Sequence, residues 1–290
     1  MLAMFKKELR SYFHGITGFV FVALLLVVFG LYATMICFSY GSPHYDYVFY
    51  NCSFIFLIAI PVLTMRSFSE ERRQRTDQLL YSLPVSTAQI VVGKYLAMLC
   101  VFALPILVSC LYPLLIRLYD PSGCLSYTAI YSAILAFFCL GVALISIGMF
   151  ISSLTENVFI SAIVSFVTLL ICYLMGQLAD AFPSDASATT IVFAIMIFLV
   201  SLLAFFLTRS RMVGWIVFMI LEIPVAVISF VKPVLLEGML PKVFSVMSMF
   251  DRLYTFAEGM FDLKVILYFL SIAVLFTVFT VQSMEKRRWS

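Results

Sequence analysis

Eight long, mostly apolar stretches constrain the fold of this chain more than any other feature of its sequence. A transmembrane helix needs about 20 predominantly apolar residues to cross the hydrocarbon core of a bilayer. Because lipid offers the backbone no hydrogen-bond partners, only helices and closed barrels can span it, and continuous apolar runs select helices. We therefore predict an all-α, polytopic membrane protein. Its expected spans cover about 16–38, 48–65, 94–116, 128–152, 158–179, 191–208, 213–231 and 264–283.

The positions of Lys and Arg predict the orientation of the chain. Residues 1–13 place three basic side chains among apolar residues at helical spacing, which predicts an amphipathic helix on the cytoplasmic face of the membrane. Further basic clusters lie within 66–93 and at 286–288. Cytoplasmic segments of membrane proteins carry an excess of Lys and Arg. Eight spans, with both termini in the cytoplasm, place all three clusters on that side.

The segment 66–93, between the second and third expected spans, is dense in charge. Acidic residues come first and arginines follow, the order that the helix dipole and i,i+4 pairing favour. An apolar patch follows before Pro84 ends this helix, and Ser86 is placed to cap a new helix that continues into the third span. A solvated loop would explain the charges, but exposed leucines favour a docking surface. The polar part contains Glu70, Glu71, Arg72, Arg73, Arg75 and Thr76, and the apolar patch contains Leu79, Leu80 and Leu83.

Several motifs of this chain are similar to those of one transporter family. The similar positions are Glu71, Arg72, Thr76, Leu79-Leu80, Leu83-Pro84-Val85-Ser86, Gly93-Lys94, the link Ser152–Asn157 and the C-terminal part from Phe250 onward. Together they resemble ABC-2 type transporter permeases, and the variant associated with gliding motility is the most similar. That family has six spans, so the resemblance implies a six-span core with an additional pair inserted at about 185–231.

The resemblance implies a permease subunit of an exporter in the bacterial inner membrane. A separate ABC ATPase subunit would hold ATP and Mg²⁺ and bind the coupling loop 66–93, and a second permease chain would complete the transporter. The family's second, smaller contact corresponds to Thr155, Glu156 and Asn157. We expect no cofactor, metal or nucleic acid on this chain.

Catalysis is not expected of the chain itself. Gly93-Lys94 lacks the upstream glycine of a GxxxxGK[ST] phosphate loop and is followed by Tyr95. The seven cysteines contain no CxxC pair and there are only two histidines, so no metal site is indicated. We therefore predict no catalytic residue and no enzymatic activity.

Three further features have two interpretations each. Glu222 lies within the seventh expected span. It either takes part in a substrate path or in proton coupling, or it is a neutral or hydrogen-bonded glutamic acid packed between helices. Residues 232–262 form either a helix in the outer leaflet, interfacial or re-entrant, or a folded outer loop. Small residues at Gly148 and Ser152 predict a close approach of span four to a neighbour, within one protomer or at a dimer seam.

An ATP-independent secondary transporter and a membrane scaffold or intramembrane enzyme are the alternative functions. Glu222 would support the first of these, but the sequence shows no evident inverted repeat of the kind many secondary transporters have. Paired carboxylates, a His cluster or an HExxH motif would support an enzyme, and the sequence contains none of them. The coupling loop favours the ABC permease.

Overall fold

The computed structural model describes residues 2–39, 44–76, 86–119, 126–181, 189–195, 197–198, 201, 215, 218–220, 222–224, 229 and 238–288. Within these residues the chain is helical and contains no strand. It divides into two compact units: unit 1 comprises Met1–Tyr173 and Met249–Ser290, and unit 2 comprises Leu174–Ser248. The all-α prediction is confirmed for the described residues.

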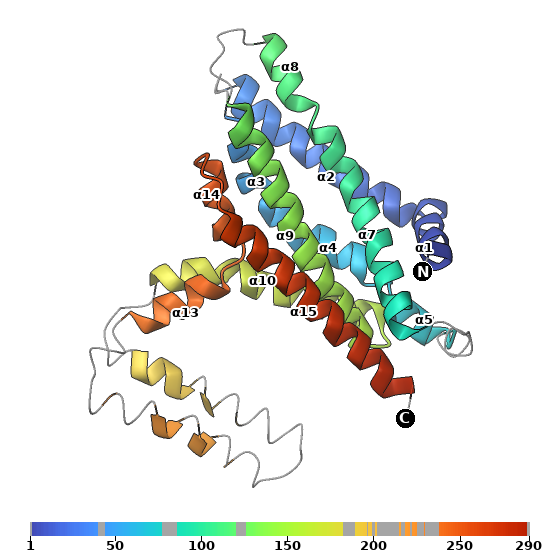
Figure 1. Cartoon of the computed structure of the whole chain (residues 1–290), viewed down its shortest axis with the longest axis vertical. Coiled ribbons are helices and arrows are strands. Elements are labelled where there is room, and N and C mark those ends of the chain that lie inside the picture. The colour runs from blue at the N-terminus through green and yellow to red at the C-terminus, as the bar shows by residue number, and fades with distance from the viewer. Residues whose placement is uncertain are drawn as a thin grey trace. The chain divides into compact units, whose positions relative to one another are not determined.

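Unit 1 is a bundle in which long apolar helices predominate (Figure 1). Its elements are α1 (Leu2–His14), α2 (Ile16–Ala33), the π-helical turn η1 (Thr34–Ser39), α3 (Asp46–Cys52), the 3-10 turn η2 (Ser53–Ile55), α4 (Phe56–Thr64), α5 (Ser69–Arg73), α7 (Thr87–Ser109), α8 (Tyr112–Tyr119), α9 (Tyr127–Leu154), most of α10 (Val158–Ala181), the 3-10 turn η4 (Asp251–Leu253), α14 (Tyr254–Ala257) and α15 (Leu263–Arg288). Unit 2 contains the end of α10 and α13 (Met239–Met247).

Six described stretches are long and apolar enough to cross a membrane. They are Ile16–Cys37, Asp46–Arg73, Thr87–Leu118, Tyr127–Leu154, Val158–Ala179 and Leu263–Arg287. They correspond to six of the eight expected spans. The other two, about 191–208 and 213–231, lie largely outside the described residues.

The third span begins earlier than its apolar run suggests. Ser86 Oγ accepts a hydrogen bond from Gln89 N at 3.3 Å and caps α7, so the predicted cap is confirmed. A side-chain cap satisfies one of the backbone N–H groups that have no partner in the first helical turn. Residues 87–93 form the first turns of α7, as the predicted helix from Ser86 into the third span requires.

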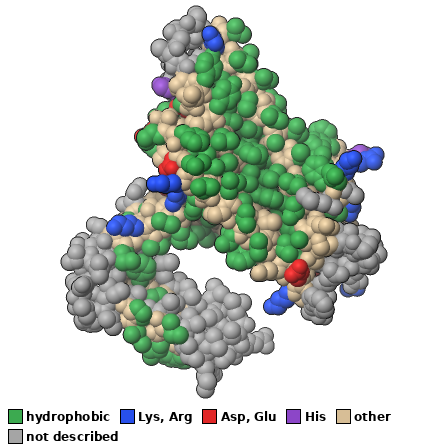
Figure 2. Space-filling view, viewed as in Figure 1, with side chains coloured by type: hydrophobic (Ala, Val, Ile, Leu, Met, Phe, Trp, Pro, Cys, Tyr) green, Lys and Arg blue, Asp and Glu red, His purple; other side chains and the backbone are tan. Residues whose placement is uncertain are grey.

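Helix α9 lies at the centre of unit 1. It is apolar on all sides, which is typical of a buried helix. In its most apolar stretch of 18 residues, 83% of the residues are buried. Its Phe137 ring lies 4.4 Å from the Phe56 ring and 5.6 Å from the Phe29 ring between centroids. The corresponding stretches of α2, α10 and α15 are only 17–28% buried. Figure 2 accordingly shows hydrophobic side chains over much of the visible face.

Residues 232–262 contain several short helices where the structure describes them. The helix α13 belongs to unit 2, whereas η4 and α14 belong to unit 1 and contact α9. Phe256 is fully buried and the Arg252 guanidinium lies 4.2 Å from the Tyr268 ring centroid. Whether this segment lies in a leaflet or forms an outer loop stays a prediction.

A close contact between α4 and α9 confirms packing within one protomer at Gly148. A Cβ atom on Gly148 would lie 2.4 Å from Thr64 Oγ1 and 3.0 Å from Thr64 Cβ. Thr64 is fully buried, and its hydroxyl donates to Ile60 O at 2.9 Å, which fixes its rotamer. The absence of a side chain at Gly148 therefore sets the distance between the two helices.

We expect Gly148→Ala to destabilise the protein by about 1–3 kcal/mol, because overpacking of a filled core costs that much. Gly30→Ala is the matched control, since a Cβ on Gly30 would lie 3.4 Å from Tyr112 Oη, which is tight but tolerable. Both changes bring the same gain in helix propensity. The measurement is the thermal unfolding midpoint in detergent, and equal midpoints for the two variants would contradict the contact.

Candidate functional site

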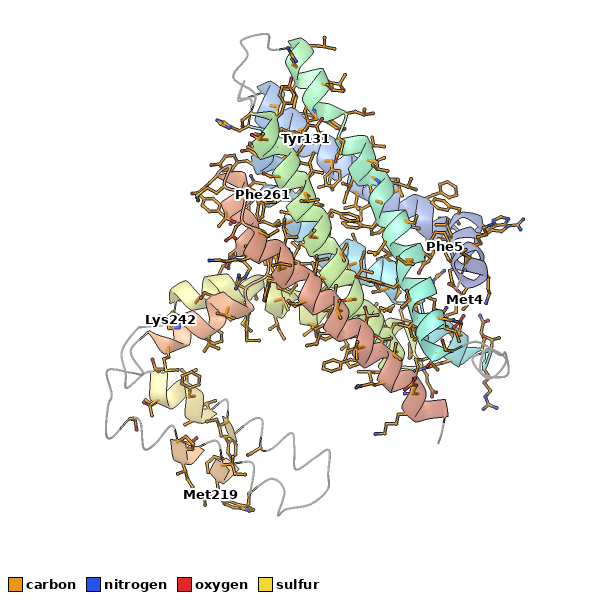
Figure 3. All side chains as sticks on the ribbon, viewed as in Figure 1. Met4, Phe5, Tyr131, Met219, Lys242 and Phe261 are labelled. Atoms are coloured by element: carbon orange, nitrogen blue, oxygen red, sulfur yellow. The ribbon has the colours of Figure 1, made fainter. Side chains whose placement is uncertain are left out.

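The first and last helices of unit 1, α1 and α15, both reach one end of the bundle. Figure 1 shows α1, α5, the start of α7 and the C-terminal part of α15 close together. Tyr131 and Phe261, labelled in Figure 3, lie far from this region, whereas Met4 and Phe5 belong to it. We call this region the charged end of unit 1 and define it by Glu8, Glu71, Arg72, Lys94, Glu285 and Arg287.

Lys94 is the most deeply buried charge of the charged end, with a side chain only 2% exposed. Its Nζ lies 2.8 Å from Glu71 Oε1 and 3.0 Å from Glu8 Oε1, and it donates to Ser67 O at 2.9 Å. An ammonium group has three N–H donors, and these three acceptors match them. A buried charge requires such compensation, because desolvation is costly. The Lys94 side chain thus connects α7 to α1, to α5 and to the turn that precedes α5.

The base of the coupling loop is fixed to α9 by one hydroxyl group. Ser152 Oγ accepts hydrogen bonds from Phe68 N at 3.2 Å and Ser69 N at 3.3 Å and lies 3.3 Å from Met65 O. The two amides belong to the N-cap residue and the first residue of α5, where backbone N–H groups have no partner within the helix. The predicted close approach at Ser152 is therefore also confirmed within one protomer.

Ser152→Ala is expected to destabilise the protein by about 1–3 kcal/mol, because it leaves buried amides without an acceptor. Ser153→Ala is the matched control, since Ser153 is equally buried and its hydroxyl donates to Phe150 O at 2.7 Å in its own helix. Thermal unfolding and limited proteolysis near Arg73 report the difference. A Ser153→Ala variant that is as unstable as Ser152→Ala would contradict the role of Ser152.

The predicted coupling residues divide into inward and outward groups. Glu71 faces Lys94, and Arg72 is buried, with Nη2 3.6 Å from Met284 Sδ. Arg73 and Arg75 are exposed, and Glu70 is half-buried. Arg75 has a positive φ of 55°, which departs from the helical conformation after α5. Thr76 N donates to Glu71 O at 2.9 Å and closes this turn.

The apolar patch Leu79, Leu80 and Leu83 lies outside the described residues. Its contact with an ATPase stays a prediction. The described residues on either side of the patch, Thr76 and Ser86, both belong to unit 1. Of the residues predicted to contact an ATPase in this loop, Arg73 and Arg75 are the exposed cations.

The second predicted contact belongs to the same end of the bundle. Arg287 Nη2 of α15 donates to Leu154 O at 3.0 Å, and Arg287 Nη1 lies 3.8 Å from Glu156 Oε1. Asn157 Oδ1 accepts from Phe159 N at 2.9 Å and caps the start of α10. Thr155 lies between them. The link between α9 and α10 is therefore joined to the C-terminal part of α15.

A tyrosine on α1 completes the contacts of the charged end. Tyr12 Oη donates to Leu63 O at 3.3 Å. Burial raises the pKa of Tyr12 well above its usual range, and the neighbouring Glu8 raises it further. The phenol therefore stays protonated and keeps α1 attached to α4.

Glu222 belongs to unit 2 and is half-buried. Its Oε2 is buried and has no hydrogen-bond partner in the part of the chain that is described. No hydrogen bond of this oxygen therefore supports the interpretation of Glu222 as a hydrogen-bonded acid. A role of Glu222 in transport stays a prediction.

The sequence contained signals for some residues that we did not assign to the site. Lys94 is the only charged residue of the 23-residue helix α7. Glu8 lies on the flank of α1 that carries Tyr12, away from the basic residues Lys6 and Arg10. Isolated charges at such positions indicate partners within the protein. The contacts of Thr87, Met284 and Glu285 have no comparable signal in the sequence.

Comparison with known proteins assigns the family. A family model described as ABC-2 family transporter protein matches residues 33–188, which is more than half of the chain. The match includes the base of the coupling loop, Lys94 and the link between α9 and α10. Neither a curated protein nor a solved structure gave a significant match. The chain therefore belongs to the ABC-2 family of membrane transporter proteins.

Proposed function

We propose that this chain is the membrane-spanning permease subunit of an ATP-driven exporter and that a separate ABC ATPase binds at the charged end. ABC-2 permeases generally work with an ABC ATPase subunit. In this proposal ATP and Mg²⁺ are held by the ATPase, and a second permease chain completes the transporter. The chain would lie in the bacterial inner membrane with eight spans and both termini in the cytoplasm, in a system of the gliding-motility type.

The connections of the coupling loop are the observation that carries this proposal. Its base contacts α1 and α7 through Lys94, α9 through Ser152 and α15 through Arg72. A force applied to the loop would therefore reach four helices at once. Because packed cores have discrete arrangements and do not deform continuously, such a joint would transmit a displacement into the membrane region.

The outward and inward groups of the loop suggest a division of roles. Arg73 and Arg75 would pair with acidic groups of the ATPase, and Leu79, Leu80 and Leu83 would anchor it. Glu70 and Thr76 would border this surface, with a smaller contact at Thr155, Glu156 and Asn157. Glu71 and Arg72 contact the bundle, so they would act on its helices and not on the ATPase.

A capture experiment tests the proposal. The detergent-solubilised chain is incubated with ABC ATPase subunits from the same organism, as wild type and as Leu79→Asp/Leu80→Asp. We expect the wild type to retain one ATPase and the variant to lose it while its thermal unfolding midpoint is unchanged. Leu263→Asp, at an exposed position beside Asp262 and Lys264 at the start of α15, is the control and should retain the ATPase.

Secondary transport is the second candidate function, because Oε2 of Glu222 is buried and has no hydrogen-bond partner among the described residues. If no ATPase is retained by either form of the chain, the permease proposal fails. Uptake by proteoliposomes under a proton gradient, compared between wild type and Glu222→Gln, would then test the second candidate.

A further inference from the structure

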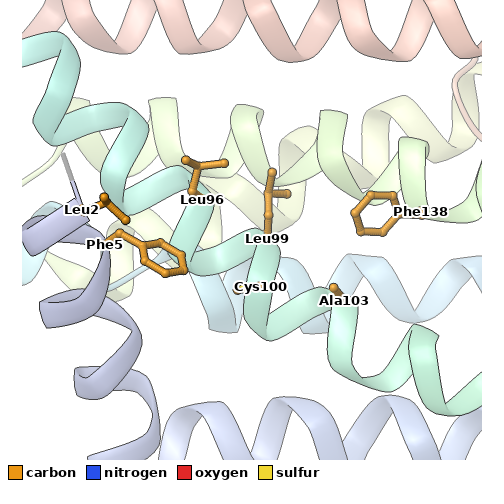
Figure 4. Close-up of a pocket in the computed structure, with 7 residues that line it drawn as sticks. All are labelled: Leu2, Phe5, Leu96, Leu99, Cys100, Ala103 and Phe138. Carbon is orange, nitrogen blue, oxygen red and sulfur yellow. The ribbon is translucent and has the colours of Figure 1, made fainter.

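An apolar groove of about 430 Å³ lies between α1 and α7. Figure 4 shows that Leu2 and Phe5 of α1 line it together with Leu96, Cys100 and Ala103 of α7. Phe138 of α9 also borders the groove. All of the lining side chains are hydrophobic, so the groove offers no hydrogen bond to a polar ligand.

The groove begins where the charged end stops. Lys94 precedes Leu96 by two residues, and Leu96 to Ala103 cover about 10 Å along the helix axis at a rise of about 1.5 Å per residue. These residues lie within a stretch that is apolar enough to cross a membrane. In a bilayer we therefore expect the groove to face the hydrocarbon core just below the level of the lipid headgroups.

A basic hollow of about 480 Å³ lies on the other flank of α1 and is lined by Lys6, Lys7, Arg10, Ser11 and His14. Lys7 lies 4.0 Å from Glu71 Oε1. Lys6 and Arg10 form no ion pair in the described residues, and both are exposed. Leu2, Lys6 and Arg10 are spaced four residues apart, so they form one row along α1 that leads from the groove to the hollow.

We propose that the groove and this row bind one anionic phospholipid of the membrane. One acyl chain lies along Leu96, Cys100 and Ala103, and the phosphate contacts Lys6 and Arg10. The apolar walls match an acyl chain and not a water-soluble ligand. Lys6 and Arg10, which follow Leu2 along one row of α1, complement a headgroup with net negative charge. A zwitterionic headgroup brings a cation of its own to the same place and gains less.

Titration of the detergent-purified full chain with dioleoylphosphatidylglycerol, followed by native mass spectrometry, tests the site. We expect one molecule of dioleoylphosphatidylglycerol to bind per chain, with a higher affinity than dioleoylphosphatidylcholine has. Each basic residue near an anionic lipid surface is worth about 1 kcal/mol, so Lys6→Gln/Arg10→Gln should weaken phosphatidylglycerol binding about 30-fold. This variant should leave the weaker binding of phosphatidylcholine unchanged.

The groove itself is tested by filling it. Cys100→Trp should abolish the tight binding of phosphatidylglycerol. Ala103→Leu, which fills less of the groove and should weaken binding, replaces it as the test if Cys100→Trp does not fold. Val108→Trp, at an exposed position of the same helix that is turned away from the row Leu96, Cys100 and Ala103, and Lys264→Gln, at the start of α15, are the controls and should bind as the wild type does. Equal affinity for the two lipids, or an equal loss in Val108→Trp, would show only a non-specific lipid shell and overturn the proposal.

Discussion

Replacing Lys94 by methionine is expected to lower the thermal unfolding midpoint of the detergent-solubilised protein by on the order of 5–10 °C. Lys94 is 2% exposed, and its removal leaves Glu8 and Glu71, 12% and 17% exposed, facing each other without the cation between them. Removal of one partner from a buried ion pair costs about 3–5 kcal/mol, mostly because the remaining charge is uncompensated. The partial exposure of the two carboxylates places the expected loss at the lower end, about 3 kcal/mol.

Lys7→Met is the matched control for this prediction. Lys7 lies 4.0 Å from the same Glu71 carboxylate, but its side chain is 61% exposed, and exposed pairs contribute about 0–1 kcal/mol. Both variants remove one positive charge beside Glu71, so net charge alone cannot separate them. Equal midpoints for Lys94→Met and Lys7→Met would show that the burial of Lys94 has no energetic consequence.

A double-mutant cycle isolates the pair that joins α1 to α7. Glu8→Gln alone removes one acceptor of the Lys94 ammonium, and in the background of Lys94→Met it removes a carboxylate that has lost its cation. We therefore expect the double variant Glu8→Gln/Lys94→Met to be more stable than the sum of the single changes predicts, by about 1–3 kcal/mol. Additive effects would mean that the 3.0 Å distance between Lys94 Nζ and Glu8 Oε1 reflects proximity without coupling.

The helices of unit 1 could be predicted from the sequence because the bilayer leaves few alternatives. A run of apolar residues about 20 long has to satisfy its own backbone, and a helix does so within the run. Six expected spans agree with described helices to within a few residues at most ends. The start of α7 differs more, since hydropathy marks the edge of the membrane, whereas the Ser86 cap marks the end of the helix.

The inward orientation of Glu71 and Arg72 could not be predicted in this way. The charge order of α5 is compatible with any rotation of a five-residue helix about its axis. The rotation is selected by groups far away in the sequence: Lys94, Ser152 and Met284. Local preferences describe a helix and its ends, but they contain no information about the partners of its faces.

The C-terminal part of α15 gives the second large prediction. Met284 is 2% exposed and lies against Arg72, Glu285 Oε1 accepts from Thr87 Oγ1 at 2.8 Å, and Arg287 contacts the link after α9. The triple variant Met284→Ala/Glu285→Ala/Arg287→Ala keeps the helix, because alanine has the highest helix propensity. It loses the contacts of α15 with α5, α7 and the end of α9.

We expect this triple variant to be destabilised by about 3–6 kcal/mol. Truncation of a buried methionine to alanine costs about 2–5 kcal/mol, and the loss of a hydrogen bond to a carboxylate adds about 1 kcal/mol. The Arg287 side chain is 39% exposed, and its pair with Glu156 adds little. Thermal unfolding measures the total, and proteolysis after Arg73 should accelerate because α5 has lost one of its supports.

The matched control is Gln282→Ala/Lys286→Ala, which changes two exposed residues on the same turns of α15. Its midpoint should remain within about one degree of the wild type, because surface substitutions away from specific contacts change stability by less than about 0.5 kcal/mol. If the control loses as much as the triple variant, the end of α15 is simply intolerant of substitution. If only the triple variant loses stability and proteolytic protection, a segment more than 200 residues away in the sequence holds the base of the coupling loop, and any displacement of that loop must also move α15.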